Sequence, residues 1–261
     1  MTLFVHELRR GWKALAIWAA SICGMMLICL MMFPEMKAQM SGLTDMFARM
    51  GAFTAAFGMD KISFASPLGF YGIECGNILG LGGAMYAALL GAAALGGEEA
   101  GHTAEFLLTH PVRRGRVAAE KLLAVLAQVL ILNLLALLTG YLGFLAVGEA
   151  VSAADFLRMH AAWLAMQLEL ACLGFGLSPF LRGGLGASMG LSLGLYFLSL
   201  AANISEKAAF LRWISPFSYC DAATVLSDGQ LNAPLLAVGL AYALIAACIG
   251  WQRFARKDVC G

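Results

Sequence analysis

Long runs of residues without charge constrain this chain more than any other feature of its sequence. Residues 14–33 and residues 122–147 contain no Asp, Glu, Lys or Arg. A helix needs about 20 apolar residues to cross the hydrocarbon core of a bilayer. Only 13% of the residues are charged and 61% are hydrophobic, whereas a soluble domain carries roughly a quarter charged residues. The sequence therefore predicts a polytopic membrane protein.

The apolar pattern predicts an all-α membrane protein with six transmembrane helices in a single transmembrane domain, residues 1–261. The expected spans are about 14–33, 70–95, 122–147, 159–180, 185–202 and 234–251. Before the first span, Leu3, Phe4, Leu8 and Trp12 alternate with charged residues, which indicates an N-terminal interfacial helix in the headgroup layer. Residues 34–66 and 203–233 are expected to form outer amphipathic segments.

The positive charges are sorted by position. With this layout, eleven of the 17 Lys and Arg residues fall on one side: Arg9, Arg10, Lys13, Arg113, Arg114, Arg116, Lys121, Arg182, Arg253, Arg256 and Lys257. Cytoplasmic loops of plasma-membrane proteins carry such an excess. We therefore expect both termini to be cytoplasmic, in a multi-pass protein of the cell membrane. A net charge of +1 gives no indication of nucleic-acid binding.

The stretch Gly97–Lys121, here called the polar segment, is a charged interruption between the second and third spans. Acidic residues stand at its start, where they favour a helix dipole, and Pro111 precedes the basic cluster Arg113, Arg114 and Arg116. This order predicts a short cytoplasmic helix that docks a soluble partner. The alternative is an ordinary basic loop between two spans.

Two spans carry small residues at every fourth position. The first ridge is Gly72, Gly76 and Gly80, and the second is Gly186, Gly190 and Gly194. Such ridges allow helix backbones to approach closely in lipid. We expect the second to pack against another subunit, with packing inside the chain as the alternative.

Three polar residues lie within predicted spans. Glu74 and Asn77 are near the outer end of the second span, and Glu169 is near the middle of the fourth. A carboxylate at that depth is costly unless it is paired, protonated or facing water, so it marks a candidate transport path. Each residue also has a structural alternative: Glu74 can reach the interface, and Glu169 can hold two helices together by a hydrogen bond.

No catalytic pattern is present in the sequence. There is no GxxxxGK[ST] phosphate-binding loop and no HExxH or GxSxG motif. The seven cysteines form no CxxC pair, so neither a disulfide framework nor a zinc site is predicted. We expect no metal or cofactor on this chain, and any energy for transport must come from another chain.

Three stretches resemble the permease subunits of type-2 ABC exporters. They are EEAGHTAEFLLTHPVRRGRVAAEK at 98–121, SPFSYCDA at 215–222 and FARKDV at 254–259. The first is similar to the polar loop after the second span of that family, the second to its outer segment and the third to its basic C-terminal end. The order of spans is similar as well, so the resemblance extends over nearly the whole chain.

The resemblance implies a permease that hydrolyses nothing itself. In that family the polar segment contains a coupling helix that sits in a cleft of an ABC ATPase subunit. The residues it implies for this contact are Glu98, Glu99, Thr103, Glu105, Leu108, Pro111, Arg113 and Arg114. Two ATPases, which bind ATP and Mg²⁺, would join two permeases, a second copy or a related chain. The permease contact would use the first and fifth spans.

Two other functions stay open on the sequence. One is an intramembrane enzyme that uses Glu169, Glu74 and His160, which requires these residues to converge. The other is a non-transporting sensor or accessory protein that recruits a soluble partner through the same polar segment.

Overall fold

The computed structural model describes residues 2–256 except 49–50, 60, 101–112 and 182–184, and all regular structure in these ranges is helical. The long helices are α1 (Thr2–Ala48), α3 (Pro67–Ala100), α5 (Arg114–Val147), α6 (Ala153–Leu177), α7 (Leu185–Ile204) and α9 (Ala233–Arg256). The short ones are α2 (Gly51–Ala56), η1 (Ser178–Phe180), η2 (Glu206–Trp213), η3 (Pro216–Ser218) and α8 (Ala222–Asp228).

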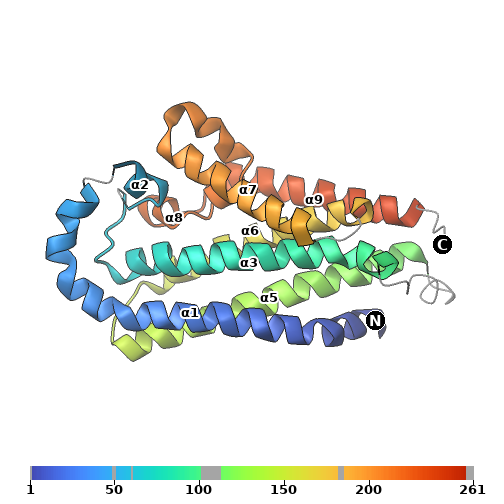
Figure 1. The fold of residues 1–261 in the computed structure, drawn as a ribbon, viewed down its shortest axis with the longest axis horizontal. Coiled ribbons are helices and arrows are strands. Elements are labelled where there is room, and N and C mark those ends of the chain that lie inside the picture. The colour runs from blue at the N-terminus through green and yellow to red at the C-terminus, as the bar shows by residue number, and fades with distance from the viewer. Residues whose placement is uncertain (1, 49–50, 60, 101–112, 182–184, 257–261) are drawn as a thin grey trace.

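The six long helices are long and apolar enough to cross a membrane, which confirms the predicted all-α membrane architecture. They run side by side along the long axis of the molecule (Figure 1). The N-terminal end of α1, the end of α3, the start of α5 and the end of α9 lie at one end of the bundle (Figure 1). The short helices α2 and α8 lie at the opposite end, which we call the outer end.

The residues expected to form the N-terminal interfacial helix are the first turns of the long helix α1. Helix α1 is continuous from Thr2 to Ala48, with no break before residue 14. Two groups of its first turns contact α5: Lys121 Nζ donates to Glu7 Oε1 at 3.0 Å, and the Phe4 amide donates to Glu120 Oε2 at 3.2 Å. The basic side chains of Arg9, Arg10 and Lys13 are exposed. The first turns of α1 therefore contact α5 through Glu7 and the Phe4 backbone, and their basic side chains lie on the exposed side.

Helix α1 also continues past Pro34, through the first part of the expected outer segment. Proline inside a helix removes one backbone hydrogen bond and kinks the chain. Beyond this residue α1 curves across the outer end of the bundle toward α2 (Figure 1). There Lys37 Nζ donates to Glu149 Oε1 at 2.6 Å, in the connection between α5 and α6.

Helices α3 and α6 form the centre of the bundle. In their most apolar windows, 56% and 67% of the residues are buried, against 22% in α1, 22% in α7 and 17% in α9. Small residues bring the two backbones together: a Cβ atom at Gly174 would lie 2.5 Å from the Ala88 carbonyl oxygen. Trp163 and Tyr71, both buried, fill the outer half of this seam.

A polar clasp joins three helices in the middle of the bundle. Gln167 Nε2 donates to the Leu79 carbonyl oxygen at 3.0 Å, and Asn133 Nδ2 donates to Gln167 Oε1 at 2.8 Å. Gly83 leaves the space that the Gln167 amide occupies. The clasp fixes α3, α5 and α6 relative to one another, because side chains in lipid find few other hydrogen-bond partners.

Candidate functional site

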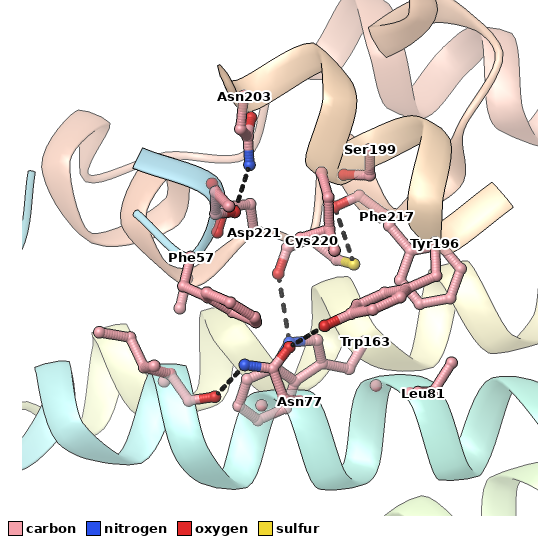
Figure 2. A pocket seen from close by; sticks show the side chains of 17 residues that line it. Phe57, Asn77, Leu81, Trp163, Tyr196, Ser199, Asn203, Phe217, Cys220 and Asp221 are labelled. Carbon is pink, nitrogen blue, oxygen red and sulfur yellow. Dashed lines mark hydrogen bonds between the residues drawn. The ribbon is translucent and has the colours of Figure 1, made fainter. Parts of the chain in front are cut away.

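A small polar pocket lies in the outer half of the bundle, between α3, α7 and the outer helices (Figure 2). Its volume is about 60 Å³, enough for one or two water molecules. The polar side chains in its wall are Asn77 from α3, Tyr196, Ser199 and Asn203 from α7, and Asp221 at the start of α8.

Asn77 links α3 with α7 at the edge of this pocket. Its Nδ2 donates to the Ile73 carbonyl oxygen at 2.7 Å, and its Oδ1 accepts from the Tyr196 hydroxyl at 3.0 Å. Figure 2 shows the two side chains meeting from their separate helices. The predicted path residue Asn77 is thus engaged in a contact between the central helix α3 and the peripheral helix α7.

The outer segment enters the bundle at the same pocket. Trp163 Nε1 donates to the Cys220 carbonyl oxygen at 3.2 Å, and Phe217, Tyr219 and Cys220 are all buried. The expected outer amphipathic segment at 203–233 therefore consists of short helices, and part of it descends between the long ones.

Asp221 begins α8 and is the acidic group of the pocket. Its Oδ1 accepts from the Ala223 amide and its Oδ2 accepts from the Thr224 hydroxyl, both at 3.4 Å. Burial raises the pKa of the Asp221 carboxyl above its ordinary value of 3.8, although the Ala223 amide and Lys61 oppose the shift.

Glu74 is half-buried on α3, one turn before Asn77. Among the described residues it forms no hydrogen bond and no ion pair. A lone carboxyl group in a membrane helix is costly when it faces lipid. This placement is typical of a residue that faces water or another subunit.

Glu169 occupies a different environment from Glu74. It is 1% exposed, and its Oε2 accepts from the Tyr219 hydroxyl at 2.9 Å. Gly239 of α9 lies against the same oxygen, where any side chain would clash. The alternative that Glu169 holds elements together by a hydrogen bond is therefore supported, with a tyrosine of the outer segment as the partner.

Glu169 also forms part of the wall of an apolar groove of about 670 Å³ between α5, α6 and α9. Leucines supply most of the surface, including Leu123, Leu126, Leu240 and Leu244. We call this feature the lateral groove.

The three residues of the enzyme alternative do not form one site. His160 Nε2 is hydrogen-bonded to the Tyr71 hydroxyl at 2.8 Å inside an aromatic cluster with Phe156 and Trp163. Glu169 accepts a hydrogen bond from Tyr219, and Glu74 is hydrogen-bonded to neither His160 nor Glu169. In the described part of the chain no group of His, Cys, Asp and Glu could hold a metal ion.

The second glycine ridge has no neighbour within the described chain. A Cβ atom at Gly186, Gly190 or Gly194 would meet nothing within 4 Å outside its own helix. All three glycines are exposed, and Phe197 on the same side of α7 is 61% exposed. The small residues of α7 therefore do not serve packing among the described helices.

At the other end of the bundle, Ser178 joins α6 to the last turns of α3. Its hydroxyl donates to the Ala92 carbonyl oxygen at 2.7 Å and accepts from the amides of Leu95 and Gly96 at 2.9 and 3.0 Å. One side chain thus contacts three backbone groups of α3 directly before the polar segment.

Comparison with known proteins decides the family. A protein-family model described as ABC-2 family transporter protein matches residues 1–259. The chain belongs to the ABC-2 family. The members of this family are the membrane permease components of ABC transporters, distinct from the catalytic ATPase. Membership implies association with ABC ATPase partners. The search of curated proteins found no match to this chain.

Half of the eight residues that the resemblance assigns to the ABC-2 coupling helix lie outside the described part of the chain. Thr103, Glu105, Leu108 and Pro111 fall within residues 101–112. The backbone at Glu98 and Glu99 belongs to the last turn of α3. Arg113 caps the start of α5 and is exposed, and Arg114 is its first residue. Both ends of the polar segment are therefore helical extensions of spans.

Three polar residues important to this ABC-2 chain were missed in the sequence. Tyr219 bonds Glu169 and Tyr196 bonds Asn77, and Ser178 holds the end of α3. Tyr219 stands inside the SPFSYCDA stretch, so that stretch was the available signal. Ser178 carries no signal beyond the proline that follows it, because a serine between apolar residues is common in membrane helices.

Proposed function

We propose that this chain is the permease subunit of an ATP-driven exporter, coupled to a separate ATPase through the polar segment. Both ends of the polar segment lie at the same end of the bundle as the chain termini (Figure 1), and the basic residues predict that this end is cytoplasmic. ATP and Mg²⁺ bind the ATPase in this scheme, and the permease of the cell membrane binds neither.

The observation that carries the proposal is the placement of Ser178. Its three hydrogen bonds connect α6, the most buried span, to α3 within a few residues of the polar segment. A push on the polar segment would reach the core of the bundle directly, because α3 and α6 are also in backbone contact at Gly174.

We further propose that two permeases pair through α1 and α7. The open ridge at Gly186, Gly190 and Gly194 fits a helix of a second copy or a related chain. Exposed large side chains on α1, such as Ile17 and Ile28, extend this apolar face. In such a pair, the face of α3 that carries Glu74 and Asn77 would be directed at the interface between the two permeases. We propose that this face forms the transport path.

The test is co-expression of this chain with a candidate ABC ATPase, followed by affinity purification and an ATPase assay. We expect Glu99→Lys and Arg114→Glu each to abolish co-purification or to reduce ATPase activity by about tenfold, since each reverses a charge at the proposed contact. Glu206→Lys, an exposed acid at the outer end, is the matched control and should change neither.

Two results would contradict the proposal. If ATPase association and ATPase activity both survive the two charge reversals, the polar segment is not the contact. If the chain associates with an ATPase but no substrate moves in reconstituted vesicles, the accessory-protein alternative is favoured.

A further inference from the structure

The lateral groove lies on the spanning parts of α5, α6 and α9. Its volume is within the ~300–1,000 Å³ of small-molecule sites in proteins. Leucines from α5 and α9 form its open rim: Leu123, Leu130, Leu240 and Leu244 are 56%, 44%, 46% and 68% exposed. A membrane lipid or another lipophilic molecule can therefore enter from the side.

The groove lies away from α7 and extends to the end of the bundle where α1 and α5 begin. Phe4 and Glu120, near the start of α1 and α5, line the part of the groove closest to the end of the bundle where α1 begins and α9 ends. Helix α7 packs mainly on α3 and the outer helices, so its open ridge belongs to another surface. Of α1, only Phe4 lines the groove, whereas the proposed pairing uses Ile17 and Ile28. The proposed pairing of permeases therefore leaves the groove accessible from the lipid.

Glu169 makes this groove different from an ordinary lipid-facing surface. The carboxyl group receives one hydrogen bond, from Tyr219, and no other hydrogen bond or ion pair from the described residues. A carboxylate offers about four acceptor positions. Among the described residues that line the groove there is no Lys or Arg, so none of these side chains places a cation against this acid.

We propose that the lateral groove binds a lipophilic amine, with its alkyl part on the leucines and its protonated nitrogen at Glu169. An acid in hydrocarbon is strongly favoured by a cationic partner, and the groove is the side from which a partner can arrive. This inference rests on the proposed function, because it names the class of substrate that the permease would take up from the membrane.

A plain acyl chain fits the same apolar wall but leaves Glu169 without a second partner. Binding of the amine should therefore depend on the carboxyl group of Glu169, and binding of a plain acyl chain should not. A bound alcohol would donate a hydrogen bond to Glu169 without compensating its charge, and a fatty acid would add a second acid.

The experiment is photocrosslinking of the full-length chain in phosphatidylcholine nanodiscs, without ATPase or ATP. The probes are hexadecylamine, hexadecanol and palmitic acid, each with a diazirine on the alkyl chain. Labelled residues are mapped by mass spectrometry. We expect the amine to label the groove, around Cys172 and Leu240–Leu244, about tenfold more than either other probe, which corresponds to ~1.4 kcal/mol.

Three variants make the test decisive. Glu169→Gln keeps an oxygen that can accept from Tyr219, so the fold is retained, and amine labelling should fall to the level of the alcohol. Tyr219→Phe keeps the acid and should retain amine labelling. Ala127→Phe fills the groove from α5 and should reduce labelling by all three probes.

Equal labelling by the three probes, or amine labelling that survives Glu169→Gln, would show a surface for ordinary lipids and overturn the inference. Labelling confined to residues outside the groove would overturn it as well. The labelling assay contains no ATPase, so its result can be read even if the proposed ATPase coupling is wrong. Loss of amine labelling with intact ATPase association contradicts only the inference.

Discussion

The two glycine ridges of this chain have the same sequence pattern and opposite surroundings. On α3, a Cβ atom at Gly72 would lie 2.5 Å from the Ala222 Cβ, and one at Gly76 would lie 2.9 Å from the Trp163 ring. On α7, the equivalent atoms at Gly186, Gly190 and Gly194 would meet nothing within 4 Å among the described residues. The first ridge is used inside the chain, and the second is left open.

The difference shows what a small-residue ridge does and does not determine. The spacing indicates that a backbone can be approached closely, but it is silent on which helix approaches. On α3 the neighbours come from α6 and α8, far along the sequence. On α7 the apolar stripe continues through Phe197 and Ile204, both exposed, so the open ridge is part of a larger surface.

The largest expected effect comes from filling the occupied ridge. Gly76→Leu places a branched side chain against the Trp163 ring, which is buried and hydrogen-bonded to Cys220. We expect the free energy of unfolding to fall by about 3 kcal/mol, the upper part of the usual range for overpacking. Thermal unfolding of the detergent-solubilised chain measures it. A melting temperature equal to that of the unaltered chain would mean that the ridge is not tightly packed.

Filling the open ridge should change stability less than filling the occupied ridge, but it should weaken assembly. Gly190→Leu should leave the melting temperature of the single chain unchanged or slightly raised, since the position meets no neighbour and leucine favours helix over glycine by up to ~1 kcal/mol. Pairing should weaken, as seen by native mass spectrometry. Ala241→Leu, at an exposed position of α9, is the control and should leave pairing intact. Unchanged pairing in Gly190→Leu would place the contact elsewhere.

The smallest effect concerns the outer end of the occupied ridge, where Ala222 of α8 fills the space at Gly72. Asp221 caps α8, and burial raises the pKa of its carboxyl above 3.8 in the folded chain. The folded chain therefore retains a proton that the unfolded chain has released, so stability falls as pH rises from 3.8 through the raised value. Asp221→Asn keeps the acceptor for the Ala223 amide and cannot ionise.

We expect Asp221→Asn to remove this fall, so that the variant is at least as stable as the unaltered chain at neutral pH and loses that advantage in acid. Melting temperatures across pH measure it. Asp228→Asn, at the exposed end of α8, is the control. A variant that is less stable at neutral pH would mean that the charged carboxyl is favourable at this cap.

Much of the fold could be predicted because crossing a bilayer imposes a simple rule on the sequence. The uncharged stretch 122–147 lies entirely within α5, and 70–95 lies within α3. Helix α5 begins before its apolar part, at Arg114, and Arg116 and Glu120 pair with each other along this added length at 3.0 Å. Charge alone does not end a helix.

The contacts of the candidate sites could not be predicted, because their partners are distant in sequence. Glu169 and Tyr219 are 50 residues apart, and Asn77 and Tyr196 are 119 apart. The sequence showed an acid at mid-membrane depth but carried no Lys or Arg to suggest a partner, and a tyrosine from an outer segment is not an evident candidate. For α1, the pattern of the first turns gave no indication that Glu7 and the Phe4 amide contact α5.

The two ion pairs between α1 and the α5 region have a mechanical consequence. Glu7 meets the buried Lys121 at one end, and Lys37 meets Glu149 at the other, about 45 Å apart along an α-helix of that many residues. Two such contacts oppose sliding of α1 along α5, and the partly exposed outer pair contributes about 0–1 kcal/mol to this. A displacement of the start of α5 would thus move α1 with it, and the movement would extend to the outer end of the molecule.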